Sequence, residues 1–315
     1  MSRVLVTGAS GLVGRAAVPA LADRGFEVHA VTTSREPADD ERLVWHRADL
    51  LDPRQTTEIV RATRPTHLLH LAWHTQPADI YVSPMNVRWV DAGIHLLQEF
   101  ASHGGRRAAI AGSCAEYDWS VPLSSEDTTP KEPATLYGAS KLALWLLASR
   151  MPELQDVDLA WGRLFSVFGP GEHHGRLVPF VARALLTDQP ASCTLGTQIR
   201  DFLYSGDAAA AFVALLESDV NGPVNIASGN GIPVRDLITE VGVVTGRPDL
   251  IRFGEVAMRA NEPPALVADT RRLNDEVGWK PAVGIGEGIA RTVTWWAGQL
   301  SAAEASRPAG SRAAG

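Results

Sequence analysis

The stretch Val4-Leu5-Val6-Thr7-Gly8-Ala9-Ser10-Gly11-Leu12-Val13-Gly14 decides the fold, because it joins a strand-like apolar run to a helix-like run through three glycines. A strand, a glycine-rich turn, a helix and a second strand fall within about 30 residues, which lets the backbone approach a pyrophosphate closely. N–H groups at the helix N-terminus then point at the phosphates. The stretch predicts a dinucleotide-binding turn, with a plain tight turn as the alternative.

Strand-like and helix-like runs alternate along the first half of the chain. Strands are expected at 4–6, 28–31, 43–45, 67–72 and 108–112, with helices between most of them. This alternation is typical of a parallel sheet with helices on both faces, the doubly wound α/β class. Beyond about Leu164, Gly and Pro interrupt shorter runs and indicate a smaller carboxyl-terminal lobe that binds substrate. We expect a dinucleotide-binding domain over 1–165 that takes back segments near 200–230, a discontinuous substrate lobe over 166–300, and a flexible tail over 301–315.

The composition indicates a soluble globular body. Hydrophobic residues make up 45% and charged residues 21% of the chain, close to the averages of folded soluble proteins. The net charge of −7 would repel nucleic-acid phosphates, so nucleic acid is not expected as a partner. Cys114 and Cys193 are the only cysteines, and no ligand spacing surrounds them, so neither a disulfide framework nor a metal site is expected. No apolar stretch reaches the roughly 18 residues of a membrane span and no leader precedes the first strand, so we expect no membrane association and a cytoplasmic location.

The end of the second strand indicates which dinucleotide is used. An acidic residue there would bind the ribose 2′-hydroxyl of NAD, whereas an arginine accommodates the 2′-phosphate of NADP. The strand ends Thr32-Thr33-Ser34-Arg35, without an acid and with a guanidinium. This favours NADP(H), with NAD(H) as the alternative and Arg35 then a solvated loop charge.

Tyr137 and Lys141 stand four residues apart in an apolar helical pattern, so their side chains share one helix face. A phenol with a pKa of about 10 transfers protons poorly at neutral pH, and a nearby cation lowers that pKa. The pair is the clearest candidate in the chain for acid/base chemistry, although the same spacing also occurs by chance in helices.

Ser113 ends the buried strand-like run over 109–112. The carboxyl ends of parallel strands line the crevice where ligands bind, so the Ser113 hydroxyl can reach a reacting oxygen. The GxxGxxG spacing, Ser113 four residues before Tyr117, and the Tyr137-Lys141 pair resemble, in this order, the extended short-chain dehydrogenase/reductases. That group is also called the nucleotide-sugar epimerase/dehydratase family and has a Rossmann fold. The resemblance implies that Tyr137 is the acid/base, Lys141 its electrostatic partner, and Ser113 the group that positions the substrate alcohol or carbonyl.

The resemblance also implies a set of residues that contact the cofactor. These are Gly8, Ser10, Gly11, Leu12, Val13, Gly14, Thr32, Arg35, Asp49, Leu50, Leu71, Ala72, Trp73, Tyr137 and Lys141.

The resemblance continues into the carboxyl half. Ser166 stands where the family's RxxNVYGP stretch usually has Asn, and Arg200 lies in a stretch like the family's GxxxRDF. By analogy Arg200 and Arg259 bind the pyrophosphate of a nucleotide-diphosphate sugar, because planar guanidinium groups suit its two charges. The alternative is that they form structural ion pairs with Asp201 or Glu262.

The residues after Ser113 indicate which reaction is catalysed. Cys114 and Ala115 replace the Asp-Glu pair of the family's 4,6-dehydratases, so ordinary 4,6-dehydration is not expected. The string GSCAEYDW at 112–119 resembles 4-ketoreductases that make 6-deoxyhexoses on a nucleotide carrier. Our leading hypothesis is NADP(H)-dependent reduction of the C4 ketone of a nucleotide-linked 4-keto-6-deoxyhexose. Glu116 then holds a sugar hydroxyl or is a solvated charge, and Cys114 is a substrate contact or a small core residue.

Two alternatives to this reaction stay open. One is a nucleotide-sugar 4-epimerase with tightly bound NAD, and the other is a catalytically silent NADP-binding regulator, because a fold alone does not determine function.

The resemblance further implies a homodimer through a four-helix bundle, built from the helices expected near 87–100 and 136–150. Candidate contacts are Trp89, Leu96, Leu144 and Leu147, although apolar stripes at this spacing are more often plain core.

Overall fold

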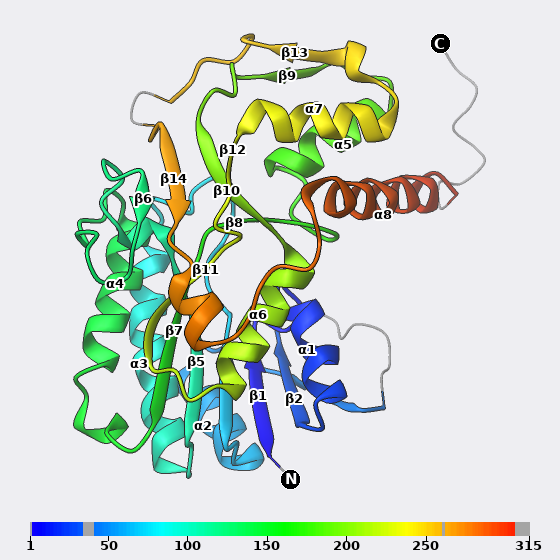
Figure 1. The fold of residues 1–315 in the computed structure, drawn as a ribbon. Helices are drawn as coiled ribbons and strands as arrows, with labels where there is room; N and C mark the ends of the chain where they lie inside the picture. Colours follow the sequence, from blue (N-terminus) through cyan, green and yellow to red (C-terminus); the bar gives the residue numbers. More distant parts are fainter. Residues whose placement is uncertain (1, 34–40, 260–261, 306–315) are drawn as a thin grey trace.

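The computed structural model describes residues 2–33, 41–259 and 262–305 and is built around a seven-stranded parallel sheet (Figure 1). The strand order is β11-β7-β5-β4-β1-β2-β3. Their bounds are β1 (Arg3–Thr7), β2 (Glu27–Thr32), β3 (Leu43–Arg47), β4 (His67–His70), β5 (Arg107–Ser113), β7 (Asp158–Leu164) and β11 (Gly222–Ile226). Apolar runs such as Val4-Leu5-Val6 are fully buried, as expected for strands covered on both faces. The predicted doubly wound α/β fold is confirmed.

Helices cover both faces of this sheet. On one face lie α1 (Gly14–Asp23) and α6 (Ser205–Glu217), with Leu21 and Phe212 in the core beneath them. On the other face lie α2 (Pro53–Thr63), α3 (Met85–Ser102) and α4 (Leu136–Ala148), with Leu68, Phe100 and Trp161 in a second core. Because α6 and β11 come from the carboxyl half of the chain, that half contributes to the large sheet layer as well.

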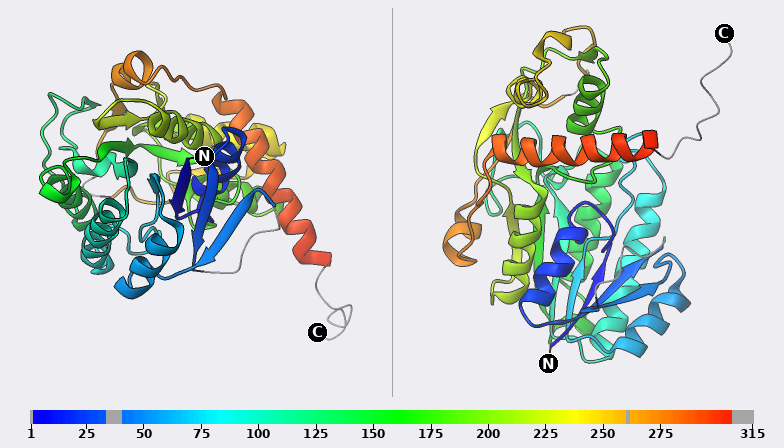
Figure 2. Two further views of the ribbon diagram at one scale, coloured as in Figure 1. Left: turned by 90° about the horizontal axis from the view of Figure 1, so that it is seen from below. Right: turned by 90° about the vertical axis from the view of Figure 1, so that its right-hand side faces the viewer.

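Smaller sheets and three further helices lie beyond the carboxyl edge of the large sheet (Figure 1). One small sheet consists of β6 (Leu123–Ser124), β8 (Ser166–Phe168), β10 (Ile199–Tyr204), β12 (Gly231–Pro233) and β14 (Ala265–Ala268), and a second pairs β9 (Ala191–Cys193) with β13 (Ile251–Phe253). The helices are α5 (Leu177–Leu186), α7 (Val234–Thr245) and α8 (Ile285–Ala305). They pack together around Leu237 and Ile289, and Figure 2 shows α8 running beneath α5 and α7. This arrangement places the lobe above the ends of the long strands, where a ligand could be enclosed.

The carboxyl-terminal helix corrects one prediction. The flexible tail expected over 301–315 is wrong for residues 301–305, which continue α8. Alanine-rich sequence such as Ala302-Ala303 extends a helix at little cost. Residues 306–315 lie outside the described residues.

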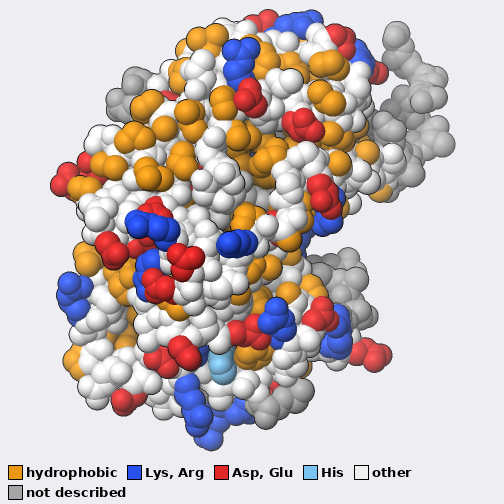
Figure 3. All heavy atoms as spheres, in the orientation of Figure 1, with side chains coloured by type: hydrophobic (Ala, Val, Ile, Leu, Met, Phe, Trp, Pro, Cys, Tyr) orange, Lys and Arg blue, Asp and Glu red, His pale blue; other side chains and the backbone are white. Residues whose placement is uncertain are grey.

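The surface charges and the helix lengths concern two partners that the sequence does not predict, nucleic acid and a membrane. On the face drawn in Figure 3, acidic and basic side chains are interspersed, and hydrophobic side chains are more frequent over the upper part than over the lower part. Among the described residues, no helix is both long enough and apolar enough to span a membrane.

Candidate active site

The glycine-rich turn connects β1 to α1 at the carboxyl edge of the large sheet. Gly8 has a φ of +67°, and a Cβ built on it would lie 2.7 Å from the backbone nitrogen of Ala72. Because only glycine tolerates both conditions, the turn closes directly against Leu71 and Ala72 at the end of β4. The Ala72 N–H also donates to Oγ1 of Thr7 at 3.3 Å. This backbone cradle, which leads into the N-terminus of α1, fits a dinucleotide pyrophosphate.

The end of β2 carries hydroxyl groups rather than a carboxylate. Oγ of Ser10 lies 3.2 Å from Oγ1 of Thr32, the last residue of the strand. Arg35, on which the prediction of NADP rests, lies outside the described residues. The described part of this corner therefore lacks the acid that would bind an NAD ribose.

The remaining predicted cofactor contacts lie around the start of α1 and the end of β3. Val13 is buried and Leu12 is half-buried at the turn, while Leu50 is buried after β3. Asp49 is exposed, and its carboxylate accepts a hydrogen bond from the Leu51 N–H at 3.0 Å. These positions surround the edge at which the adenosine end of a dinucleotide is expected.

Ser113 and Tyr137 meet because α4 packs closely against η1 (Cys114–Glu116), a short 3-10 helix that follows β5. A Cβ on Gly138 would overlap the carbonyl oxygen of Ala115, so glycine is needed for this approach. Burial raises the pKa of Tyr137, and the neighbouring Ser113 side chain opposes that rise.

Lys141 lies one turn further along α4 and is almost fully buried. Its Nζ donates to the carbonyl oxygen of Ala111 at 2.7 Å and lies 3.7 Å from the ring centroid of Trp73. The Trp73 ring also meets the Tyr137 ring edge-on, with the centroids 6.5 Å apart. Burial lowers the pKa of Lys141 to about 7, and the charge of Glu116 opposes this shift. The three predicted catalytic side chains thus lie around the carboxyl end of β5, where Trp73 contacts both the Lys141 amine and the Tyr137 ring.

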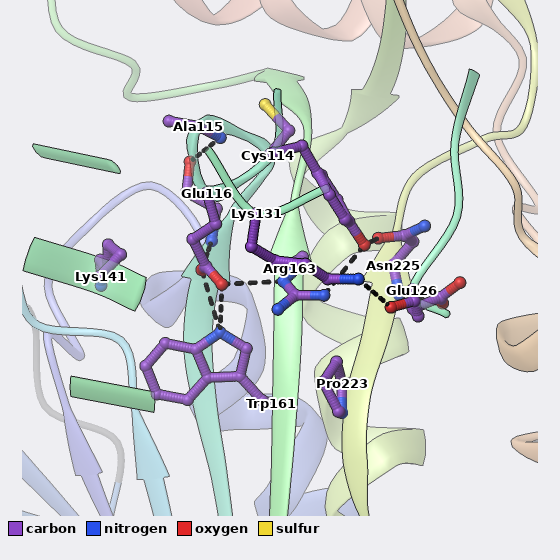
Figure 4. A network of polar contacts seen from close by, with 12 residues as sticks. Cys114, Ala115, Glu116, Glu126, Lys131, Lys141, Trp161, Arg163, Pro223 and Asn225 are labelled. Carbon is purple, nitrogen blue, oxygen red and sulfur yellow. Dashed lines mark hydrogen bonds and ion pairs between the residues drawn. The ribbon is translucent and has the colours of Figure 1, made fainter. Parts of the chain in front are cut away.

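Glu116 is not placed as the sequence predicted. It is fully buried, and its Oε2 lies 2.8 Å from Nε of Arg163 on β7. Nε1 of Trp161 donates to the same carboxylate at 2.9 Å, as does the Ser113 N–H at 2.7 Å (Figure 4). The prediction that Glu116 holds a sugar hydroxyl is wrong, and so is the alternative of a solvated charge, because donors of the protein core already occupy both carboxylate oxygens.

The two predicted pyrophosphate arginines lie on neighbouring segments of the lobe. Arg200 on β10 is buried and forms an ion pair with Glu262, which was the structural alternative. The Glu262 N–H donates to the carbonyl oxygen of Arg259 at 3.1 Å. Arg259 is exposed, and its guanidinium carbon lies 6.0 Å from the ring centroid of Tyr81.

Cys114 and Ser166 are half-buried between the sheet and the lobe. Burial raises the pKa of the Cys114 thiol to about 12, so the thiol keeps its proton at neutral pH and cannot act as a thiolate base. Ser166 opens β8 and is paired in register with Phe202 of β10.

Tyr81 is a site residue that the sequence reasoning missed. Its ring meets the rings of Tyr137 and Trp119 edge-on at centroid distances of 6.3 and 6.2 Å. Its carbonyl oxygen also accepts the Tyr137 N–H at 3.4 Å. Tyr81 lies in the loop between β4 and α3, where no periodic pattern indicates a contact. Only its place after a strand end at the ligand-binding edge could have indicated a role.

Comparisons with known proteins find relatives that match nearly the whole chain. A family model described as "NAD dependent epimerase/dehydratase family" matches residues 4–227. A UDP-glucose 4-epimerase of Azospirillum brasilense is 26% identical over 98% of this chain and 96% of its own length. A CDP-abequose synthase of Salmonella typhimurium is 24% identical over 91% of this chain and 95% of its own length.

A solved structure shows the same fold. The UDP-glucose 4-epimerase of Thermus thermophilus, in complex with NAD, superposes with a TM-score of 0.83 at 26% identity, over 94% of this chain and 99% of that chain.

Proposed function

The chain belongs to the NAD dependent epimerase/dehydratase family, an extended short-chain dehydrogenase/reductase group of enzymes, and on this premise we propose that it reduces the C4 ketone of a nucleotide-linked 4-keto-6-deoxyhexose with NADPH. The proposal is supported most by the position of Ser113 and Tyr137 at the end of β5, with Nζ of Lys141 bound to the carbonyl oxygen of Ala111 in the same strand. The similarity to a CDP-abequose synthase supports a deoxysugar on a nucleotide carrier.

The proposed chemistry divides among the three residues. A bound dinucleotide supplies the hydride that C4 receives. Tyr137 donates its phenolic proton to the ketone oxygen, and Ser113 hydrogen-bonds the same oxygen and keeps it in place. Lys141, as the ammonium form, stabilises the phenolate that Tyr137 becomes. Ser113 and Lys141 are buried and Tyr137 is partly buried, which limits the access of water and strengthens these interactions.

Residues from the lobe would hold the substrate at this point. In our proposal Arg200 and Arg259 bind the pyrophosphate, because their segments are joined through Glu262 beside the site. Tyr81 and Trp119 form an aromatic wall next to Tyr137, against which the apolar face of a deoxysugar can pack.

We propose NADP(H) as the preferred dinucleotide. The hydroxyl groups of Ser10 and Thr32 stand where an acid would select NAD. Steady-state turnover with NADH and with NADPH tests this preference. We expect a lower KM for NADPH, and a strong preference for NADH would overturn the assignment.

A second candidate is a nucleotide-sugar 4-epimerase with tightly bound NAD. The similarity to two UDP-glucose 4-epimerases, one of them solved with NAD, favours it. The same three residues would serve, because an epimerase removes and returns the hydride at the same carbon.

The stoichiometry of the dinucleotide distinguishes the candidates. A panel of nucleotide-linked 4-keto-6-deoxyhexoses and nucleotide hexoses is incubated with the enzyme and NADPH. A reductase consumes one NADPH per product formed, whereas an epimerase forms product without consuming added dinucleotide. Product without NADPH consumption would refute the reductase. Dinucleotide binding with no turnover on the whole panel would refute both reactions and favour the silent regulator.

We also propose a homodimer and a cytoplasmic location. The outer faces of α3 and α4 expose Val87, Leu146 and Leu147, which supports pairing of these helices with a second copy. The two thiols, Cys114 and Cys193, are free, which supports a reducing compartment.

A further inference from the structure

Glu116 has a role in the structure that its sequence position does not suggest. Oε1 accepts the Ser113 N–H at 2.7 Å and Nε1 of Trp161 at 2.9 Å. Oε2 accepts Nε of Arg163 at 2.8 Å. Every one of these partners is a donor, so the pocket suits an anion and would repel an amide NH2 group (Figure 4).

We propose that Glu116 is a positioning residue for the reaction, whose carboxylate fixes Ser113 and supplies the negative charge that acts on Lys141. This inference rests on the proposed function. Glu116 touches neither the substrate nor the dinucleotide in this account.

The first part of the inference concerns Ser113. Its N–H is held by Glu116 and its Oγ accepts the Ala115 N–H at 3.1 Å, which together form a capping box around η1. Backbone and side chain of Ser113 are therefore both held, next to the phenol of Tyr137, whose pKa the Ser113 side chain lowers. Displacement of a positioning group by about 1 Å can cost on the order of 100-fold in rate.

The second part concerns Lys141. Its ammonium group has an uncharged carbonyl and an indole ring as direct partners. Three titratable groups lie around it. Nζ of Lys141 donates to the carbonyl oxygen of Ala111, and Glu116 accepts the N–H of Ser113 two residues further along, so the amine and the carboxylate are held by neighbouring residues at the end of β5. His70 is neutral because burial holds its pKa at about 3, and Tyr137 is protonated because burial raises its pKa. The negative charge of Glu116 raises the pKa of Lys141. Loss of this charge therefore disfavours the ammonium form that the proposed mechanism needs.

The chain offers a direct measurement, because it contains only three lysines, Lys131, Lys141 and Lys280. Selective 13C labelling of lysine gives three side-chain signals, which K131R and K280R assign. The titration of Lys141 is then followed in the wild type, in Glu116→Gln, and in Glu126→Gln as the matched control. Glu126 is a buried carboxylate of the same network, where it accepts the Asn225 N–H at 2.7 Å.

We expect the Lys141 signal to titrate at lower pH in Glu116→Gln and at the wild-type pH in Glu126→Gln. An unmoved Lys141 titration in Glu116→Gln would overturn the inference, as would an equal shift in Glu126→Gln. A purely structural ion pair would not move this signal.

Kinetics supply a second readout. In Glu116→Gln we expect kcat to fall about 10- to 100-fold, with the alkaline loss of activity beginning at lower pH and KM values nearly unchanged. Glu116→Asp should restore part of the wild-type pH profile, because it restores the charge. A wild-type pH profile in Glu116→Gln would contradict the inference.

A second variant keeps the inference testable if Glu116→Gln fails to fold. Removing Glu116 alone leaves Arg163 as an unpaired buried charge, which is strongly destabilising. The double variant E116Q/R163M removes both charges, and we expect the same shift of the Lys141 titration. An unshifted titration there would also overturn the inference. Failure of the inference is distinguishable from failure of the proposed function, because the titration is read without substrate, whereas an active Tyr137→Phe variant would refute the function itself.

Discussion

His70 is a buried histidine that ties the glycine-rich turn to the site. Its Nδ1 lies 2.7 Å from Oγ1 of Thr7, the residue before Gly8. Burial, with a smaller contribution from the charge of Lys141, lowers the pKa of His70 to about 3. The imidazole is therefore neutral throughout the working pH range. It gains a proton only when the chain unfolds, and it takes no part in proton transfer during catalysis.

This pKa predicts an acid sensitivity of the fold. A histidine in the unfolded chain has a pKa of about 6.5. Below that pH the unfolded chain therefore binds a proton at His70, whereas the folded chain does not. His70 thus contributes nothing to pH dependence above about pH 6.5 and costs stability increasingly as the pH falls towards 3. Between pH 7 and pH 5 the loss is about 2 kcal/mol.

Urea unfolding at pH 7 and pH 5 measures the effect. We expect the difference in the free energy of unfolding between the two pH values to be smaller by about 2 kcal/mol in His70→Gln. His174→Gln, at an exposed histidine, is the control and should behave as the wild type. A His70→Gln variant with the full wild-type pH dependence would contradict the account.

Arg259 carries the prediction for substrate binding. Its guanidinium is exposed beside Tyr81 and is available to a pyrophosphate. We expect Arg259→Ala to raise the KM for the nucleotide sugar by about tenfold or more, because a charge-assisted hydrogen bond contributes about 1.5–3 kcal/mol. The KM for NADPH should change little. Equal effects on the two KM values, or an unchanged KM for the nucleotide sugar, would show that Arg259 does not bind the substrate.

Single residues differ in how far the sequence predicts them. The spacing of Tyr137 and Lys141 follows from helix geometry, so their common face could be predicted. The surroundings of Glu116 could not, because Arg163 lies 47 positions away in the sequence. That contact depends on β5 and β7 lying side by side. Likewise, no local pattern shows that Trp73 would pack against Lys141.

At the scale of elements, the packing of α4 on η1 brings the site together. Thr135 caps α4 by accepting the Gly138 N–H at 3.1 Å, which fixes where the helix begins and therefore where Tyr137 points. Gly138 then allows the first turn of α4 to touch η1. The relative position of Tyr137 and Ser113 is set by these two features.

Gly138→Ala tests this packing. The added methyl group would overlap the carbonyl oxygen of Ala115, so we expect a loss of about 1–3 kcal/mol of stability and a lower kcat. The matched control is Gly298→Ala in α8, where nothing lies within 4 Å of the added group. That variant should be as stable as the wild type or slightly more stable. Thermal unfolding measures the stability of the two variants, and steady-state kinetics measure their kcat. A harmless Gly138→Ala would show that the close approach is not needed.

Elements with strong local patterns could be predicted, and short ones could not. The long buried strands and the helices between them follow from apolar runs and glycine turns. Strands as short as β9 and β13, three residues each, leave too little pattern to detect. The two strands pair with each other across about 60 positions of sequence, so each forms only when the tertiary fold brings the other beside it.

At the scale of the whole molecule, the predicted dimer surface needs correction. Leu96 and Leu144 are fully buried in the core between α3, α4 and the sheet, so they cannot contact a second copy. Trp89 is half-buried and stacks on Trp73 at a centroid distance of 6.0 Å. Leu147 is 51% exposed and remains a candidate contact.

The dimer proposal predicts that Leu147→Glu weakens association. A carboxylate placed in an apolar interface loses its hydration without gaining a partner. Sedimentation analysis should show the wild type as a dimer and the variant shifted towards monomer. The circular dichroism spectrum of the variant should match that of the wild type, because the substitution lies on the surface of the subunit. A wild-type monomer, or an unaffected variant dimer, would contradict the proposed surface.

The central claim is that Tyr137 exchanges a proton with the substrate oxygen while hydride is transferred at C4. Its most direct test is Tyr137→Phe, which removes one oxygen atom from a ring that is packed by Trp73 and Tyr81. Turnover on the nucleotide sugar and the dissociation constant of NADPH are measured on the same preparation. We predict a fall in turnover of about 100- to 10,000-fold with dinucleotide affinity within about twofold of the wild type. A variant that keeps full turnover would contradict the account.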